Sequence, residues 1–220
     1  MDIFAIFISS FVIGFSGAMM PGPLLTVAIA QSARRGFIAG PLLILGHVLL
    51  ELLLVVALLL GLAEFLTKPS VGNVIALVGG VVLLYLGYGM ARDAYLGKLT
   101  LNMPGEGKTE QREITGVSSG VQLMLTGAVV SLSNPYWSLW WATIGLGYIT
   151  LSLKEGPLGL GLFFTGHALS DIIWYCAVAG AVVAGRKVLS PQVYRAILLV
   201  CGIFLIFLGG MFIYRGFTGV

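Results

Sequence analysis

Two uncharged stretches constrain the fold of this chain more than any other feature. Residues 3–33 and 114–153 contain no Asp, Glu, Lys or Arg. A helix of about 20 apolar residues crosses the hydrocarbon core of a bilayer, so each stretch exceeds one straight crossing. Of all 220 residues, 58% are hydrophobic and 10% are charged, without the alternation typical of a β-barrel. We therefore expect an all-α integral membrane protein, because helices satisfy their own backbone hydrogen bonds in lipid.

The apolar runs predict six transmembrane helices, at residues 4–31, 37–63, 70–91, 117–152, 157–184 and 194–214. The first and fourth runs lie in the two long uncharged stretches, and each contains proline near its middle, in "MPGP" (20–23) and "SNPYW" (133–137). Proline cannot donate the backbone hydrogen bond that continues a helix. We therefore predict that the first and fourth helices are broken near mid-membrane.

The basic residues fall mainly on one side of this expected topology. Nine lie in alternate loops: Arg34, Arg35, Arg92, Lys98, Lys108, Arg112, Arg186, Lys187 and Arg195. Three lie in the other loops: Lys68, Lys154 and Arg215. The positive-inside rule then predicts a multi-pass protein of the plasma (cytoplasmic) membrane with both termini outside. The formal charge of +3 is too small and too scattered for a nucleic-acid-binding surface.

A polar motif recurs in the two halves of the chain. "GHVLLE" (46–51) lies in the second expected helix and "GHALSD" (166–171) in the fifth, and they contain the only two histidines. Three crossings in each half reverse the direction of the second half, which predicts two inverted three-helix repeats. The expected bounds are 1–95 and 114–220, joined by a polar cytoplasmic linker at 96–113, and together they form one transmembrane domain.

The two histidines each precede a carboxylate by four residues, so His47 shares a helix face with Glu51 and His167 with Asp171. A carboxylate at mid-bilayer costs about 2.5–3.5 kcal/mol on insertion scales, and such groups usually mark an ion or proton pathway. We predict that these four residues couple transport to protons or cations. The expected arrangement is a ladder, with the carboxylates central and one histidine towards each membrane face. The alternative is that the pairs only hold helices together.

The proline breaks predict the substrate site. A broken helix exposes backbone N–H and C=O groups at mid-depth, which are tolerated only against protein or a wet cavity. Several tryptophans follow the second break, and their rings could hold an ammonium group by cation–π contact, with plain packing as the alternative. The predicted substrate-binding residues are Pro21, Gly22, Pro23, Asn134, Pro135, Tyr136 and Trp140.

The chain resembles the LysE/RhtB family of amino-acid exporters. The resemblance rests on "PGPLLTVAIAQSARRGFIAG" (21–40) and "SLSNPYW" (131–137), on the six-span length and on the central polar segment. It implies a secondary exporter of amino acids or related small metabolites, with substrate-site roles for the PGP and NP motifs. Many members have an acidic residue where this chain has Leu24, and a lysine where it has Tyr136. The resemblance therefore implies no particular substrate.

Proton-coupled export of an amino acid is accordingly the predicted function. Export of a divalent transition metal is the alternative, because the wider superfamily includes heavy-metal exporters and two histidines with two carboxylates suit such an ion. An enzyme is not expected, since no CxxC or HExxH motif occurs. No cofactor is expected. The predicted partners are a small-molecule substrate, lipid, and protons or cations, and a homo-oligomer is left open.

Overall fold

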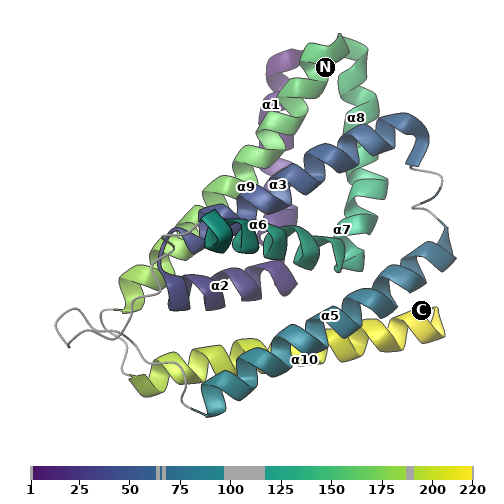
Figure 1. The fold of residues 1–220 in the computed structure, drawn as a ribbon. Helices are drawn as coiled ribbons and strands as arrows, with labels where there is room; N and C mark the ends of the chain where they lie inside the picture. The colour runs from purple at the N-terminus through teal and green to yellow at the C-terminus, as the bar shows by residue number, and fades with distance from the viewer. Residues whose placement is uncertain (1, 63–64, 66–67, 97–116, 187–190, 220) are drawn as a thin grey trace.

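The computed structural model describes residues 2–62, 65, 68–96, 117–186 and 191–219, and every regular element in these ranges is helical (Figure 1). The α-helices are α1 (Ile3–Ala18), α2 (Pro23–Arg35), α3 (Ala39–Ala57), α5 (Pro69–Tyr95), α6 (Val117–Leu132), α7 (Pro135–Trp140), α8 (Leu146–Ser152), α9 (Gly156–Arg186) and α10 (Pro191–Thr218). Two π-helical turns, Leu58–Leu62 and Trp141–Gly145, and a 3-10 turn, Leu153–Glu155, join them. The all-α prediction is confirmed.

The chain breaks at both predicted proline positions. α1 ends at Ala18 and α2 begins at Pro23, with a bend of 77° between the two helices. α6 ends at Leu132 and α7 begins at Pro135, after Asn134 has accepted a hydrogen bond from the backbone N–H of Tyr136. The first turn of a helix needs no N–H donor, so proline fits there. Each proline therefore begins a helix.

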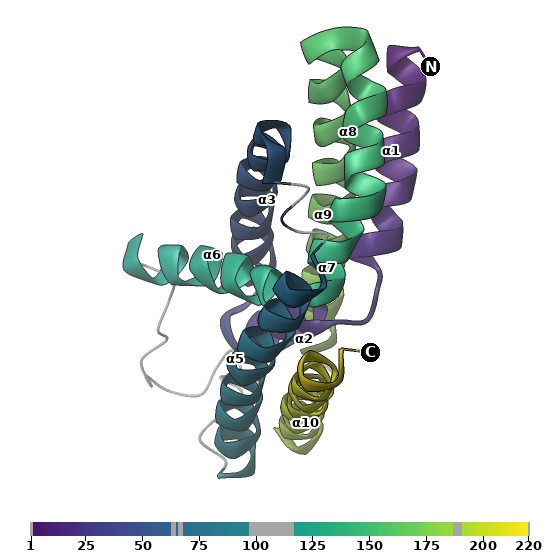
Figure 2. The same ribbon diagram turned by 90° about the vertical axis from the view of Figure 1, so that its right-hand side faces the viewer.

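Four helical runs are long and apolar enough to cross a membrane: Ala39–Leu62, Pro69–Tyr95, Pro135–Gly185 and Arg195–Thr218. The bent α1–α2 pair would add a fifth, and the apolar part of α6, Gly120–Leu132, is shorter. The 51-residue run folds back on itself. The contact that shows this is the stacking of Tyr148 on Phe163, with ring centroids 5.6 Å apart. α8 and α9 are thus two antiparallel limbs (Figure 2). The helices are those of an integral membrane protein, while six crossings remain a prediction.

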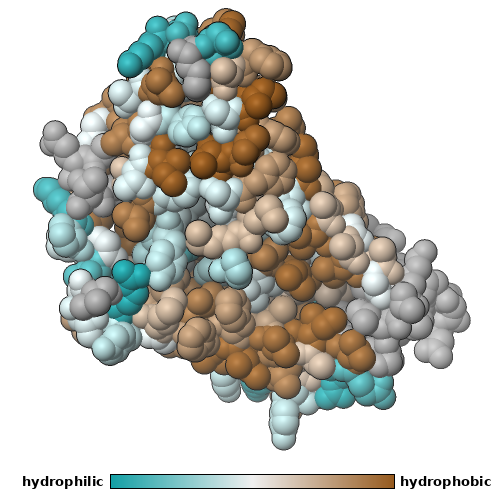
Figure 3. All heavy atoms as spheres, turned by 180° about the vertical axis from the view of Figure 1, so that it is seen from behind, coloured by the Kyte–Doolittle hydropathy of each residue, from teal (hydrophilic) through white to brown (hydrophobic). Residues whose placement is uncertain are grey.

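The outer surface of the helices is largely apolar. Large side chains such as Phe4, Leu60 and Tyr85 are 73%, 84% and 78% exposed. Figure 3 shows apolar residues over most of one face, with polar residues gathered mainly towards its ends. This is the distribution expected of a surface that contacts lipid.

The glycines of the two GH motifs let helices from the two halves approach closely. A Cβ on Gly46 of α3 would lie 2.7 Å from Met124 Cα of α6. A Cβ on Gly166 of α9 would lie 2.6 Å from the Phe7 carbonyl oxygen of α1. Each motif therefore packs against the first helix of the other half. This agrees with the predicted repeat, whose superposition stays a prediction, and the predicted linker lies almost entirely outside the described residues.

Helices α5 and α10 form a separate close pair below the other helices in Figure 1. A Cβ on Gly80 would lie 2.7 Å from the Gly209 carbonyl oxygen, and one on Gly202 would lie 2.9 Å from the Gly87 carbonyl oxygen. Helix α2 packs against α10, and α5 packs against α6 and α7, where a Cβ on Gly79 would lie 2.7 Å from the Ser133 carbonyl carbon. The pair therefore contacts the remaining helices near both proline breaks.

Candidate functional site

A cavity of about 110 Å³ lies where the two helix breaks meet the middle of α3 and α9. A water molecule needs roughly 10–15 Å³ by this measure, so the cavity has room for several waters or a small solute. It is lined by all but one of the residues predicted for substrate binding and coupling: Pro21, Gly22, Pro23, His47, Glu51, Asn134, Tyr136, Trp140, His167 and Asp171. Pro135, in the first turn of α7, does not line it.

Four titratable side chains meet at the cavity wall. His47 Nε2 lies 2.9 Å from Glu51 Oε1 and 3.8 Å from Asp171 Oδ2. His167 Nε2 lies 3.3 Å from Glu51 Oε2 and 3.4 Å from Asp171 Oδ2. All four residues are buried. Each histidine therefore contacts the carboxylates of both motifs, and we call these four residues the His–carboxylate cluster.

The contacts join the two predicted pairs, while the depth of each histidine in the membrane stays a prediction. The sequence placed each histidine beside its own carboxylate and towards a different membrane face. The structure brings both histidines onto Glu51, because α3 and α9 pack together at this level. The four side chains thus form one connected group instead of two separate pairs.

Glu51 also accepts hydrogen bonds from two tryptophans. Trp137 Nε1 and Trp141 Nε1 donate to Glu51 Oε1 over 3.1 and 3.0 Å. The two residues are four apart at the turn from α7 into the π-helical segment, so their indoles point the same way. These donors replace part of the hydration that a carboxylate loses on burial.

Ser131 fixes the orientation of His47. Its hydroxyl donates a hydrogen bond of 2.8 Å to the Gly127 carbonyl oxygen. The same hydroxyl lies 2.7 Å from His47 Nδ1. A serine hydroxyl has one proton, so with that proton on the Gly127 carbonyl the Nδ1–H must be the donor to Ser131. Nε2 is then the nitrogen of His47 that gains or loses a proton, and it faces Glu51.

The ring of His167 is held between aromatic side chains. It stacks on Trp140 with centroids 4.8 Å apart and meets the edge of Trp141 at 5.1 Å. Of the buried polar atoms around the cavity in the described residues, four have no hydrogen-bond partner: Glu51 Oε2, Asp171 Oδ2, His167 Nδ1 and Trp140 Nε1. Asp171 Oδ2 is near His167 Nε2 but not in hydrogen-bonding geometry. Buried polar groups are normally paired, so these atoms suit water or a polar solute.

Comparison with known proteins identifies the family. The model of the family described as "LysE type translocator" matches residues 15–216, which is most of the chain. The chain belongs to the LysE translocator family. The family resemblance seen in the sequence is thereby confirmed, and no solved structure matches the chain.

Three relatives of the translocator cover nearly its whole length. "Chemotactic transduction protein ChpE" of Pseudomonas aeruginosa is 28% identical over 209 residues, 94% of this chain and 97% of its own. YcgF of Bacillus subtilis, named as a candidate amino acid efflux protein, is 25% identical over 212 residues, 96% of each chain. A membrane protein of Haemophilus influenzae is 26% identical over 211 residues, 93% of this chain and 94% of its own.

The His–carboxylate cluster also contains the residue types that bind metal ions. Ligand atoms of His47, Glu51 and Asp171 all lie within 4.8 Å of one another. His47 Nε2 lies 2.9 Å from Glu51 Oε1 and 3.8 Å from Asp171 Oδ2, and two ligand atoms bound to one zinc ion at about 2.0–2.3 Å can lie this close together. Glu51 Oε1 already accepts two indole N–H groups, which cannot bind a metal.

We expect Trp141→Phe to lower the stability of the translocator by about 1–3 kcal/mol, because it removes a donor to a buried carboxylate. The matched control is Trp174→Phe, since Trp174 Nε1 has no hydrogen-bond partner among the described residues. Thermal unfolding of the purified variants in detergent measures both. Equal losses in the two variants would show that the indole N–H of Trp141 contributes nothing beyond packing.

Proposed function

We propose that the protein is a proton-coupled secondary exporter of amino acids or related small metabolites, and not an enzyme. The observation that carries the proposal is a pair of buried carboxylate oxygens that accept no hydrogen bond among the described residues, Glu51 Oε2 and Asp171 Oδ2, in a cavity with room for a solute. Both are acceptors, and an ammonium group brings three N–H donors. Trp140 lines the same cavity and adds a ring face that attracts a cation.

Substrate and proton compete for the His–carboxylate cluster in this proposal. Two carboxylates and two imidazoles are electrically neutral together when they share two additional protons. Loss of one proton leaves a net negative charge in a buried site, where an unpaired charge is costly. A substrate ammonium group can restore neutrality in place of that proton. Because the four groups contact one another, they are expected to titrate as a unit.

The first helix break supplies a place for a substrate carboxylate. Residues Gly22 to Leu25, at the start of α2, line the cavity, and α2 has 13 residues. The N-terminus of a helix carries partial positive charge and free N–H groups, which favour an anion. An α-amino acid has both the ammonium and the carboxylate group that this cavity would bind. The name of the relative YcgF supports the same substrate class.

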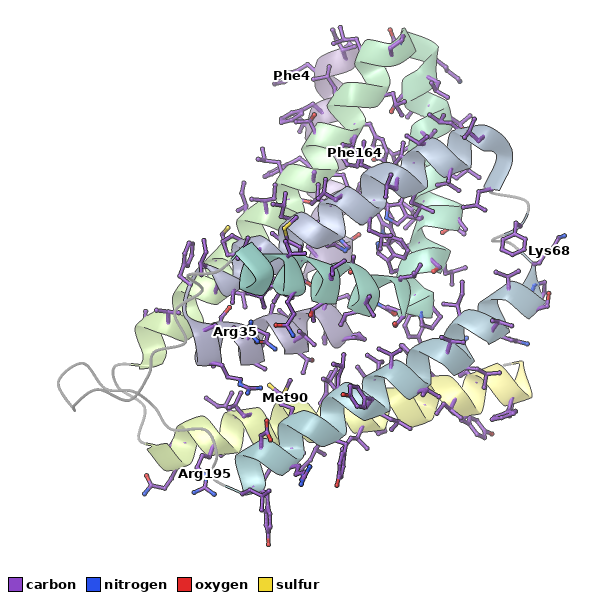
Figure 4. The ribbon with its side chains drawn as sticks, viewed as in Figure 1. Phe4, Arg35, Lys68, Met90, Phe164 and Arg195 are labelled. Atoms are coloured by element: carbon purple, nitrogen blue, oxygen red, sulfur yellow. The ribbon has the colours of Figure 1, made fainter. Side chains whose placement is uncertain are left out.

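The basic residues support an orientation for the proposed exporter. Figure 4 shows Arg35 and Arg195 towards one end of the molecule and Lys68 at the other. The positive-inside rule then puts the turn between α2 and α3 in the cytoplasm and both termini outside the plasma membrane. The predicted inverted repeat of two three-helix halves is part of the same proposal.

The second candidate function is export of a divalent transition metal. It is favoured by the convergence of His47, Glu51 and Asp171, which offer one ligand atom each. In that function the ion is the substrate. To bind it, the carboxylates of Glu51 and Asp171 would have to give up contacts with the histidines.

An efflux screen distinguishes the two candidates. Proteoliposomes are loaded in turn with each of the twenty amino acids and with Zn²⁺, Ni²⁺, Co²⁺ or Mn²⁺, and release is followed with the external medium acidic or at equal pH. We expect acidic medium outside to accelerate release of at least one amino acid. Accelerated release of metal alone would support the second candidate, and release of nothing would contradict both.

A further inference from the structure

Helices α5 and α10 form one unit that carries part of the cavity wall. Their antiparallel packing brings Gly216 of α10 beside Asn73 of α5 at one end, and Arg195 beside the last turn of α5 at the other. Leu208 and Phe212 of α10 line the cavity together with the His–carboxylate cluster. A displacement of this pair would therefore open the cavity.

Arg215 connects one end of the α5–α10 pair to the rest of the molecule. This is the end at which α10 reaches the C-terminus. Arg215 Nη1 donates a hydrogen bond of 2.7 Å to the hydroxyl of Tyr136, and the guanidinium carbon lies 5.3 Å from the centre of the Tyr136 ring. The same ring meets Phe212 edge-on at 5.7 Å. Tyr136 lines the cavity and is 36% exposed, so it stands where the cavity meets the surface. Arg215 thus positions the ring of Tyr136 at the opening of the cavity.

A second arginine ties the opposite end. Arg34 Nη2, in the last turn of α2, lies 3.7 Å from Asp93 Oδ2, near the end of α5. Both side chains are about one-third exposed. Arg195 contacts the carbonyls of Ala94 and Tyr95, but it belongs to the same pair of helices. The Arg34–Asp93 contact therefore joins α5 to α2, the helix whose first turn lines the cavity.

We propose that the Tyr136–Arg215 and Arg34–Asp93 contacts are the two gates of the cavity. Breaking the first lets the α5–α10 pair tilt away at the end of Arg215, and breaking the second lets it tilt away at the end of Arg34. Partly exposed charged contacts are weak enough to break and re-form during transport. Tyr136 acts as the gate residue of one end, and Arg215 positions it.

This proposal rests on the proposed function, because it treats the cavity as the transport pathway. Its test needs no substrate. Leu25 lines the cavity, so Leu25→Cys, in a chain with Cys176→Ala and Cys201→Ala, is labelled in proteoliposomes with a charged, membrane-impermeant methanethiosulfonate. The reagent is applied from one side at a time, and the rate of labelling is measured.

Arg215→Gln should raise the labelling rate about fivefold from the side of Arg215 and leave it unchanged from the other side. Asp93→Asn should raise it by a similar factor only from the side of Arg34, and Arg34→Gln should do the same because it breaks the same contact. Tyr136→Phe keeps the ring but loses the hydroxyl, so it should give a smaller increase on the side of Arg215. Exposed basic residues at the two ends serve as controls: Lys68→Gln and Arg92→Gln should change neither rate.

Faster labelling from both sides in every variant would indicate general loosening and would overturn the proposal. Unchanged labelling in all gate variants would overturn it as well. If the screen finds no transported amino acid while the opposite side effects appear, the gates stand and the proposed substrate class fails.

Discussion

Glu51→Gln is expected to reduce proton-driven efflux on the order of a hundredfold, the range associated with loss of a proton-transferring group. The amide keeps the shape of the side chain and can still accept from Trp137 and Trp141, but it cannot exchange a proton with either histidine. Exchange of internal for external substrate, without net proton movement, should fall much less, because the amide oxygen and Asp171 can still accept from a substrate ammonium group. Efflux from proteoliposomes after an external pH jump measures the first, and counterflow of labelled substrate measures the second.

Asp171→Asn should lose coupled efflux in the same way, because Asp171 shares both histidines with Glu51. Glu155→Gln, at the exposed turn between α8 and α9, is the control and should transport normally. A different outcome is expected if the cluster only holds helices together. The two carboxamide variants would then unfold more easily, and the folded fraction would export at the normal rate and with the normal pH dependence.

Gly46→Ala should lower the stability of the protein by about 1–3 kcal/mol. The new Cβ would lie 2.7 Å from Met124 Cα, so α3 and α6 must separate. His47 is the next residue, and its contact with Ser131 of α6 crosses the same interface. The variant should therefore lose both stability and coupled efflux.

Gly89→Ala is the matched control, because a Cβ there meets nothing within 4 Å. Alanine is a better helix former than glycine, so Gly89→Ala should leave the unfolding midpoint unchanged or slightly higher. Circular dichroism during heating in detergent compares the two. An equal, small change in both variants would mean that α3 and α6 do not approach as closely at Gly46 as the structure shows.

Much of the site was predictable from the sequence because its signals are local. Proline cannot donate the backbone hydrogen bond that continues a helix, so the breaks near Pro23 and Pro135 could be expected from the residues alone. Charge is rare in such runs, so Glu51 and Asp171 stand out as functional candidates. The structure places both carboxylates and both breaks around one cavity.

The remaining parts depend on contacts between helices distant in the sequence. Spacing within one helix shows that His167 shares a face with Asp171, but not that its Nε2 lies 3.3 Å from Glu51 on another helix. The two indole donors had a usable signal, since Trp137 and Trp141 are four residues apart and buried indoles need acceptors. The contact of Ser131 with His47 and that of Arg215 with Tyr136 had none, because each joins residues about 80 positions apart.

Proton release on substrate binding tests the central claim most directly. The purified protein in weakly buffered detergent solution is mixed with the amino acid that the efflux screen identifies, and the pH change is recorded. If substrate and protons compete for the His–carboxylate cluster, binding will release protons from the wild type and none from Glu51→Gln or Asp171→Asn. Saturable binding to the wild type with no proton release would contradict the account.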